Sequence, residues 1–277
     1  MNLKGATVID GFPSVGLVSS IVANYLVNTL ELEQIGILDS VYFPAVALVR
    51  KAEPMNSVRL YASERVHTEA GMDQLVVFVS EFQPPSNLVK IIAKTMLDWA
   101  QEQKCKRLIC PEGLIIEREG SGSAAAAAEQ QMGGGGGEEE DEGEAQQPSM
   151  ANIPPLDPNR EIALYGIAST LEARKKLEEM GVELFQEGVI TGVAGVLLNE
   201  GKVRDFEVLS FLAEAHPNIP DARAAAKVIE AINKVVPLLN VDPKPLYMEA
   251  EAIEAQLRNL HKQTKVIKQI PSPHMYG

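Results

Sequence analysis

The last three residues of the chain carry three different binding groups in a very short stretch. Met275 supplies an apolar side chain, Tyr276 a phenol, and Gly277 the free carboxylate. A pocket on another protein can bury the apolar group and the ring, while the hydroxyl gives direction and a lysine or backbone N–H groups bind the carboxylate. Pro271 and Pro273 precede them and exclude a helix or an interior strand. We therefore expect an exposed, extended docking tail.

A frayed chain end is the alternative interpretation of these residues, because the last residues of a domain are usually poorly ordered. A hydrophobic residue followed by tyrosine also arises by chance at a rate of about 1%. Two further features favour docking: the helix that precedes the tail, and the family that the rest of the chain resembles.

Two glycine loops form a second group of candidates. One lies between an expected strand at 6–10 and a helix that starts at Leu17, and the other opens a later apolar helix. Free N–H groups at a helix N-terminus can bind phosphate, but the first loop lacks P-loop and dinucleotide motifs. Close packing is therefore favoured, with a ligand loop as the alternative. The candidate residues are Gly11, Ser14, Gly16, Gly192 and Gly195.

No set of residues predicts catalysis, a metal site or a cofactor. Glu81, Glu112 and Asp39 lie at the ends of expected strands, where α/β sites form, but many solvated carboxylates lie there too. Cys105 and Cys110 give neither a disulfide framework nor a metal spacing. We therefore expect a protein that is not an enzyme. The scattered histidines are His67, His216, His261 and His274.

The composition suits a globular protein. The chain has 277 residues, of which 45% are hydrophobic, enough for one large α/β domain or two small ones. No apolar run reaches the roughly 18 residues of a membrane span, and the N-terminus lacks a signal peptide's apolar region, so we expect a cytoplasmic protein with no membrane partner. The net charge of −13 comes mostly from residues 117–147, so nucleic-acid binding is not expected.

Alternating strands and helices predict an α/β domain over residues 1–240. The apolar run at 75–79 is typical of a central strand covered on both faces. Ser86 can cap one helix, and Ser169 with Glu172 forms a capping box for another. The expected strands are 6–10, 35–43, 45–50, 57–62, 75–79, one opening at 108–110, 161–168, 182–186 and 206–212.

Two segments depart from this pattern. Residues 119–150 combine alanine, glycine and acidic runs, which predicts a disordered surface insertion, with an acidic interaction segment as the alternative. A helix over 244–270, before the tail at 271–277, carries a heptad seam. This helix can lie on its own domain or mediate self-association. The seam consists of Leu246, Ala250, Ile253, Leu257, Leu260, Thr264 and Ile267.

Four stretches, taken in order, resemble the archaeal branch of the proteasome assembly chaperone family. They are Asp10–Gly16, Phe43-Pro44, Pro111-Glu112-Gly113 and the glycines of Gly188-x-x-x-Gly192-x-x-Gly195, and the resemblance spans roughly residues 5–240. It implies an α/β fold that is a three-layer α/β/α sandwich with a mixed central sheet, similar to nucleoside phosphorylases. The insertion departs from the family pattern.

The resemblance also implies a partner. In such proteins a C-terminal hydrophobic-Tyr-any motif docks between neighbouring α-subunits of the 20S proteasome, where a lysine receives the carboxylate. Met275, Tyr276 and Gly277 match that motif. Archaeal relatives are described as assembly chaperones or ATP-independent activators, which fits the lack of a nucleotide motif. We expect a homo-oligomer, because several tails on one assembly add avidity.

Two other functions stay open at this point. A phosphate- or nucleoside-binding enzyme of phosphorylase-like fold is one, although the sequence shows no paired acid and base and no basic residue beside either glycine loop. A scaffold for a different partner that recognises the same tail is the other.

Overall fold

A computed structural model describes residues 1–68, 71–115, 160–237 and 239–268. The expected insertion at 119–150 and the tail at 271–277 lie outside these residues. The backbone of the C-terminal helix is described as far as Lys268.

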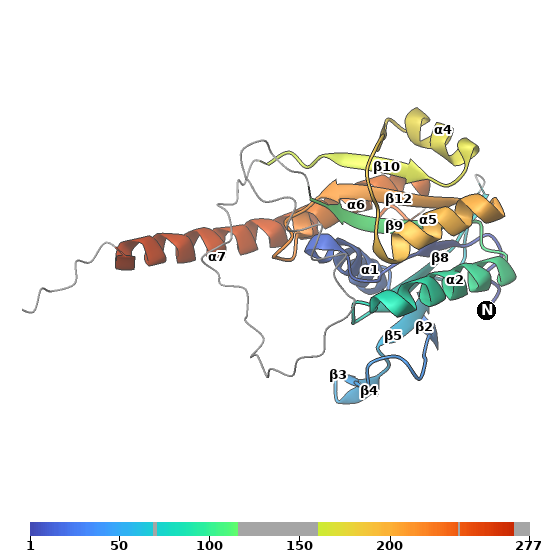
Figure 1. The fold of residues 1–277 in the computed structure, drawn as a ribbon, viewed down its shortest axis with the longest axis horizontal. Helices are drawn as coiled ribbons and strands as arrows, with labels where there is room; N and C mark the ends of the chain where they lie inside the picture. Colours follow the sequence, from blue (N-terminus) through green and yellow to red (C-terminus); the bar gives the residue numbers. More distant parts are fainter. Residues whose placement is uncertain (69–70, 116–159, 238, 269–277) are drawn as a thin grey trace, which may run out of the picture.

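An eight-stranded mixed sheet forms the centre of the fold, in the order β11-β10-β12-β9-β1-β8-β5-β2 (Figure 1). β1 pairs in parallel with β8 and β9, and β12 is parallel to β9, whereas β5 and β10 are antiparallel to β8 and β12. The strands are β1 Thr7–Ile9, β2 Glu33–Ile37, β5 Val58–Ala62, β8 Leu75–Ser80, β9 Arg107–Leu114, β10 Leu164–Ala168, β11 Glu183–Leu184 and β12 Val208–Glu214.

Helices cover both faces of this sheet. Side chains of α1, α4, α6 and the start of α7 pack on one face, and those of α2 and α5 on the other. The predicted three-layer sandwich with a mixed central sheet is confirmed. The helices are η1 Val15–Leu17, α1 Val18–Thr29, α2 Ser86–Glu102, α4 Leu171–Glu179, α5 Gly192–Arg204, α6 Ala222–Val235 and α7 Lys244–Lys268.

The central strands follow the sequence prediction closely. All six residues of β8 are buried, because both faces of this parallel region are covered by helices. Odd residues such as Val77 contribute to one core and even residues such as Val76 to the other, as the two-residue period of a strand requires.

The strands expected at 35–43 and 45–50 are wrong in extent. β2 ends at Ile37, and Leu48–Arg50 (β3) pairs with Glu53–Met55 (β4) in a separate hairpin. Between them, Ser40 N–H donates to Asp39 Oδ1 at 2.8 Å and the Ser40 carbonyl accepts from Phe43 N–H at 3.0 Å. These local hydrogen bonds form a turn in place of a strand. A second small hairpin joins β6 (Val66–Thr68) and β7 (Gly71–Asp73).

Two predicted helix caps are shifted by one residue. Thr170, not Ser169, caps α4, because its hydroxyl accepts from Ala173 N–H at 3.2 Å. The Ser169 hydroxyl instead donates to the Phe206 carbonyl at 2.7 Å and ties β10 to the start of β12. In α2, Pro85 is the cap and Ser86 the first helical residue.

The start of α7 belongs to the core of its own domain. Leu246 is 2% exposed and belongs to the same apolar cluster as α1 and α6, and Ala250 is also buried. Polar contacts reinforce the packing: Tyr247 OH donates to Glu230 on α6 at 2.8 Å. The first positions of the predicted seam are therefore buried within the chain. Beyond it, α7 projects away from the sheet (Figure 1). No helix in the described ranges is both long and apolar enough to cross a membrane.

Candidate functional site

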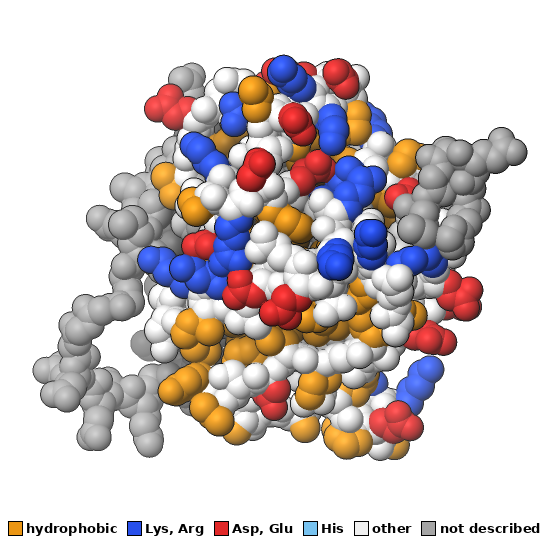
Figure 2. All heavy atoms as spheres, turned by 90° about the vertical axis from the view of Figure 1, so that its right-hand side faces the viewer, with side chains coloured by type: hydrophobic (Ala, Val, Ile, Leu, Met, Phe, Trp, Pro, Cys, Tyr) orange, Lys and Arg blue, Asp and Glu red, His pale blue; other side chains and the backbone are white. Residues whose placement is uncertain are grey.

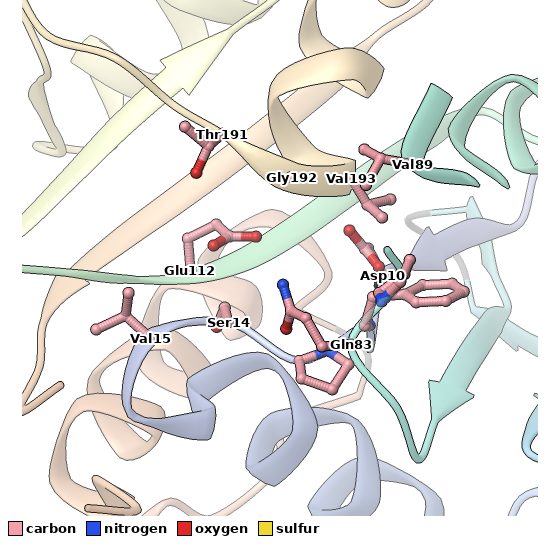
Figure 3. A pocket seen from close by; sticks show the side chains of 12 residues that line it. Asp10, Ser14, Val15, Gln83, Val89, Glu112, Thr191, Gly192 and Val193 are labelled. Carbon is pink, nitrogen blue, oxygen red and sulfur yellow. Dashed lines mark hydrogen bonds between the residues drawn. The ribbon is translucent and has the colours of Figure 1, made fainter. Parts of the chain in front are cut away.

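A cavity of about 260 Å³ lies at the carboxyl ends of the central parallel strands (Figure 3). Asp10 follows β1 directly, Glu112 lies in the second half of β9, and the exposed side chain of Gln83 lines the cavity from the segment after β8. Ser14 and Gly192 line it from the starts of η1 and α5. The segments after the neighbouring parallel strands β1 and β8 lead to α1 and α2 on opposite faces of the sheet, and in open α/β sheets the crevice at such a point holds ligands.

Asp10 and Glu112 give the cavity its chemical character. Asp10 is 1% exposed, and its Oδ1 accepts from Phe12 N–H at 3.0 Å. Burial raises the pKa of Asp10 to about 7, against the lowering effects of the Phe12 N–H and the Cys110 thiol. Burial, and then the charge of Asp10, raise the pKa of the half-buried Glu112 well above its ordinary value. Figure 3 shows both carboxyl groups directed into the same space.

The cavity does not suit phosphate. No Lys, Arg or His is among its lining residues in the described part of the chain, and two carboxyl groups would repel an anion. Basic side chains instead gather at the opposite, amino end of the parallel strands, as Figure 2 shows. There Glu207 pairs with Arg107 at 2.7 Å and with Lys176 at 3.2 Å. The phosphate interpretation of the glycine loops is therefore not supported by their surroundings.

Gly11 and Gly195 serve close packing. A Cβ atom at Gly11 would lie 2.1 Å from the Phe78 carbonyl oxygen and 2.5 Å from the Ala23 side chain, so only glycine lets α1 approach the sheet this closely. At Gly195 a Cβ atom would lie 2.2 Å from the Ile190 carbonyl oxygen. Neither residue lines the cavity.

The other three loop candidates have separate roles. Ser14 Oγ accepts from Ser19 N–H at 3.2 Å at the start of α1. Gly16 has a φ of 61°, which favours glycine, and its carbonyl accepts from Asp221 N–H at 2.8 Å. Gly192 also has a positive φ, of 71°, and begins α5. Only Ser14 and Gly192 of the five loop candidates therefore reach the cavity.

Asp10 was not predicted as the partner of Glu112. Pro111, Glu112 and Gly113 were expected after a strand but lie inside β9, opposite residues of β12. The signal that was available is an acidic residue that closely follows the apolar run of each of two buried strands, Asp10 directly and Glu112 after one proline. Glu81 does not line the cavity but binds Arg59 and Arg50. Within the described residues, no group of three or more His, Cys, Asp or Glu is placed to hold a metal.

The proposed docking residues Met275, Tyr276 and Gly277 lie outside the described residues. The structure therefore shows only the helix that leads toward them, which ends at Lys268. Their role stays a prediction.

Comparisons with known proteins agree with the fold. The chain is 28% identical to Pyrococcus furiosus PbaA, described as an archaeal homolog of proteasome-assembly chaperone, over 97% of this chain and 92% of that one, with a TM-score of 0.72. Pyrococcus furiosus PbaB, described as an archaeal proteasome activator, has the same fold, with 23% identity, a TM-score of 0.70, and coverage of 94% of this chain and 95% of that one.

A similar result comes from sequence alone. The "Uncharacterized protein MJ0106" of Methanocaldococcus jannaschii is 27% identical over 266 residues, which are 95% of this chain and 88% of that one. The sequence profile of the PAC2 family matches residues 8–261, which include nearly all of the sheet and the anchored part of α7. The chain belongs to the PAC2 family.

Proposed function

We propose that this chain is a non-enzymatic protein that binds the α-ring of the 20S proteasome through Met275, Tyr276 and the carboxylate of Gly277. It acts as an assembly chaperone or as an ATP-independent activator, and the simplest location for it is the cytoplasm. The observation that carries the proposal is the likeness to PbaA over 97% of the chain. In this proposal residues 1–240 form the body, 244–270 a helical stalk and 271–277 the docking tail.

The anchoring of α7 supports the stalk. Leu246 and Ala250 are buried against the body. Arg223 on α6 donates two hydrogen bonds of 3.0 Å to Glu254, and Tyr25 OH donates to the Asp242 carbonyl at 2.6 Å just before the helix. Its 25 residues span roughly 37 Å at 1.5 Å per residue. A base fixed by these contacts gives the tail a defined starting direction.

A homo-oligomer fits the weak binding expected of one tail. Three residues bury little surface, but several tails on one assembly raise the effective concentration and add roughly 10²–10⁴-fold in avidity. The first seam positions of α7 are occupied by α6, so association through α7 would use the part of the helix that projects from the body.

A pull-down of the 20S proteasome from the same organism tests the docking residues. The immobilised baits are the intact chain, a chain lacking Met275–Gly277, and a chain in which Met275 and Tyr276 are exchanged. The exchanged variant keeps the composition and the terminal carboxylate, so it is a matched control for nonspecific stickiness. We expect only the intact chain to retain the proteasome, because docking needs the phenol at one fixed distance from the carboxylate.

Two further variants sharpen the test. Tyr276→Ala removes the phenol alone, and one alanine added after Gly277 moves the carboxylate while keeping every native side chain. Both should lose binding with an unchanged melting temperature of the body. Binding that survives removal of Met275–Gly277 would rule out the tail as the anchor. Peptide hydrolysis by mature 20S particles, compared with the rate of α-ring assembly, then distinguishes an activator from an assembly chaperone.

A further inference from the structure

The cavity between Asp10 and Glu112 has no role in the proposed docking of the tail. It is walled by the segments after β1 and β8 and by parts of α2, β9 and α5, and it is lined on one side by apolar residues such as Phe12, Val89 and Val193. Its volume of about 260 Å³ is just below the usual range of ligand pockets, which is roughly 300–1,000 Å³. A compact ligand therefore fits it better than a nucleoside or a peptide.

The carboxyl groups in the cavity face no positive charge from its lining residues in the described chain. Asp10 is almost fully buried and is directed into the cavity, yet its hydrogen-bond partners are the neutral Phe12 N–H and the Cys110 thiol. Glu112 faces it from β9, and the lining residues of the described chain include no cation. A buried carboxylate is costly unless a positive charge or several N–H donors meet it. A bound cation would favour the ionised form of both carboxyl groups.

We propose that this cavity binds a small organic cation with a guanidinium group, held between the carboxylates of Asp10 and Glu112. A guanidinium presents five N–H donors in one plane, so its edges can donate to two carboxylates at once, and it sheds water more easily than an ammonium ion. Its flat faces suit the apolar wall. Gln83, at the exposed side of the cavity, can accept or donate a hydrogen bond to the rest of the ligand.

A divalent metal ion fits the cavity less well. Mg²⁺ held by one or two carboxylates keeps several waters that need hydrogen-bond partners, and the described residues hold no cluster of three metal-binding side chains. The apolar wall supplies no further oxygen ligands. The guanidinium class is therefore the better match to the lining.

Agmatine is a suitable probe, because it carries one guanidinium group on a short chain. In thermal melting of the full-length protein, agmatine at roughly 10 mM should raise the melting temperature by several degrees. Isothermal titration of the same protein measures the binding directly. Sodium phosphate at the same ionic strength should give no shift. Putrescine, which has amines but no guanidinium, should bind at least about tenfold more weakly.

Glu112→Gln removes one carboxylate while keeping the shape of the side chain. We expect this variant to bind agmatine at least about tenfold more weakly. The matched control is Glu102→Gln at the exposed end of α2, which should bind as the intact chain does. Melting of both variants without agmatine shows that they are folded.

Binding should also strengthen as the pH rises from about 6 to about 8, because the carboxyl groups must release their protons to pair with a cation. The titratable groups that face Asp10 are Cys110 and Glu112, both on β9, and no basic group lines the cavity in the described chain.

Several results would overturn the assignment. These are no agmatine binding up to roughly 10 mM, equal binding by Glu112→Gln, or an equal effect of putrescine, MgCl₂ or phosphate. Because this test uses only the purified chain, its outcome is independent of whether the tail binds the proteasome.

Discussion

The acidic cavity and the C-terminal arm, which consists of α7 and the residues after it, use the chain in opposite ways. The cavity combines Asp10 and Glu112, which are far apart in the sequence and meet only because β1 and β9 pair in the sheet. The arm is one continuous stretch, and its proposed docking residues are consecutive. The cavity therefore depends on the whole fold, whereas the arm depends on the fold only at its base. Substitutions and pH should affect the two regions differently.

The largest effect is expected at the base of the arm, where α7 joins the core of the body. Leu246→Ala should lower the free energy of unfolding by about 3 kcal/mol, because Leu246 is 2% exposed and truncation leaves a void against α6. Urea denaturation measures this loss. Binding to the proteasome should weaken as well, since the stalk loses part of its anchor.

Met248→Ala is the matched control for this substitution. Met248 lies on the same helix but is 69% exposed, so its truncation should change the free energy of unfolding by less than about 0.5 kcal/mol. Equal and small effects of both substitutions would show that α7 is not part of the core, and the arm would then be independent of the body throughout.

A smaller effect, which depends on pH, is expected in the cavity. From its ordinary pKa of 3.8 up to about 7, Asp10 releases its proton in the unfolded chain but keeps it in the folded chain. The free energy of unfolding therefore falls as the pH rises through this window and levels off above it. Asp10→Asn removes this dependence and keeps an oxygen that can accept from Phe12 N–H. Relative to the intact chain, the variant should gain on the order of 2 kcal/mol between pH 4 and pH 7.

Melting curves across this pH range check the sign. Asp39→Asn, in an exposed loop, is the control and should follow the intact chain at each pH. A constant difference between Asp10→Asn and the intact chain at all pH values would mean that Asp10 is already ionised in the folded protein. Glu112 faces Asp10 and titrates in the same direction, so Glu112→Gln should show a dependence of the same sign.

The fold class could be predicted from the sequence because the central strands carry their signal locally. The continuous apolar run at 75–79 became the fully buried β8. Strand ends could not be predicted as well, since short polar side chains compete for backbone hydrogen bonds. Ser40 forms a turn where a strand was expected, and Ser169 binds the β12 segment where a helix cap was expected.

The two candidate sites also differ in how local their sequence signal is. The chemistry of the tail could be predicted because Met275, Tyr276 and Gly277 are adjacent. The acid pair could not, because its geometry depends on the register of two parallel strands. Ile9 pairs with Ile109, which brings Asp10 beside Cys110 and near Glu112. A single sequence contains no information on that register unless the strand order is known.

The smallest effect is expected when each region is changed and the other is measured. Glu112→Gln should leave proteasome binding unchanged, and removal of Met275–Gly277 should leave the agmatine shift unchanged. A chain of contacts does link the regions. Val15 lines the cavity, the Gly16 carbonyl accepts from Asp221 N–H, and α6 packs on α7.

Such contacts couple the two regions only if an element along them can adopt two arrangements, and if binding in each region shifts the equilibrium between those arrangements. The linking groups are held by several hydrogen bonds: Asp221 caps α6 by accepting from Ala224 N–H at 3.0 Å and also accepts from Arg160 at 2.8 Å. We therefore expect additive effects in the double variant, within about 0.5 kcal/mol in each binding free energy. Agmatine titrations and proteasome pull-downs of the single and double variants measure this. A larger deviation from additivity would show that ligand binding in the cavity regulates the arm, and the two regions would then be allosterically coupled.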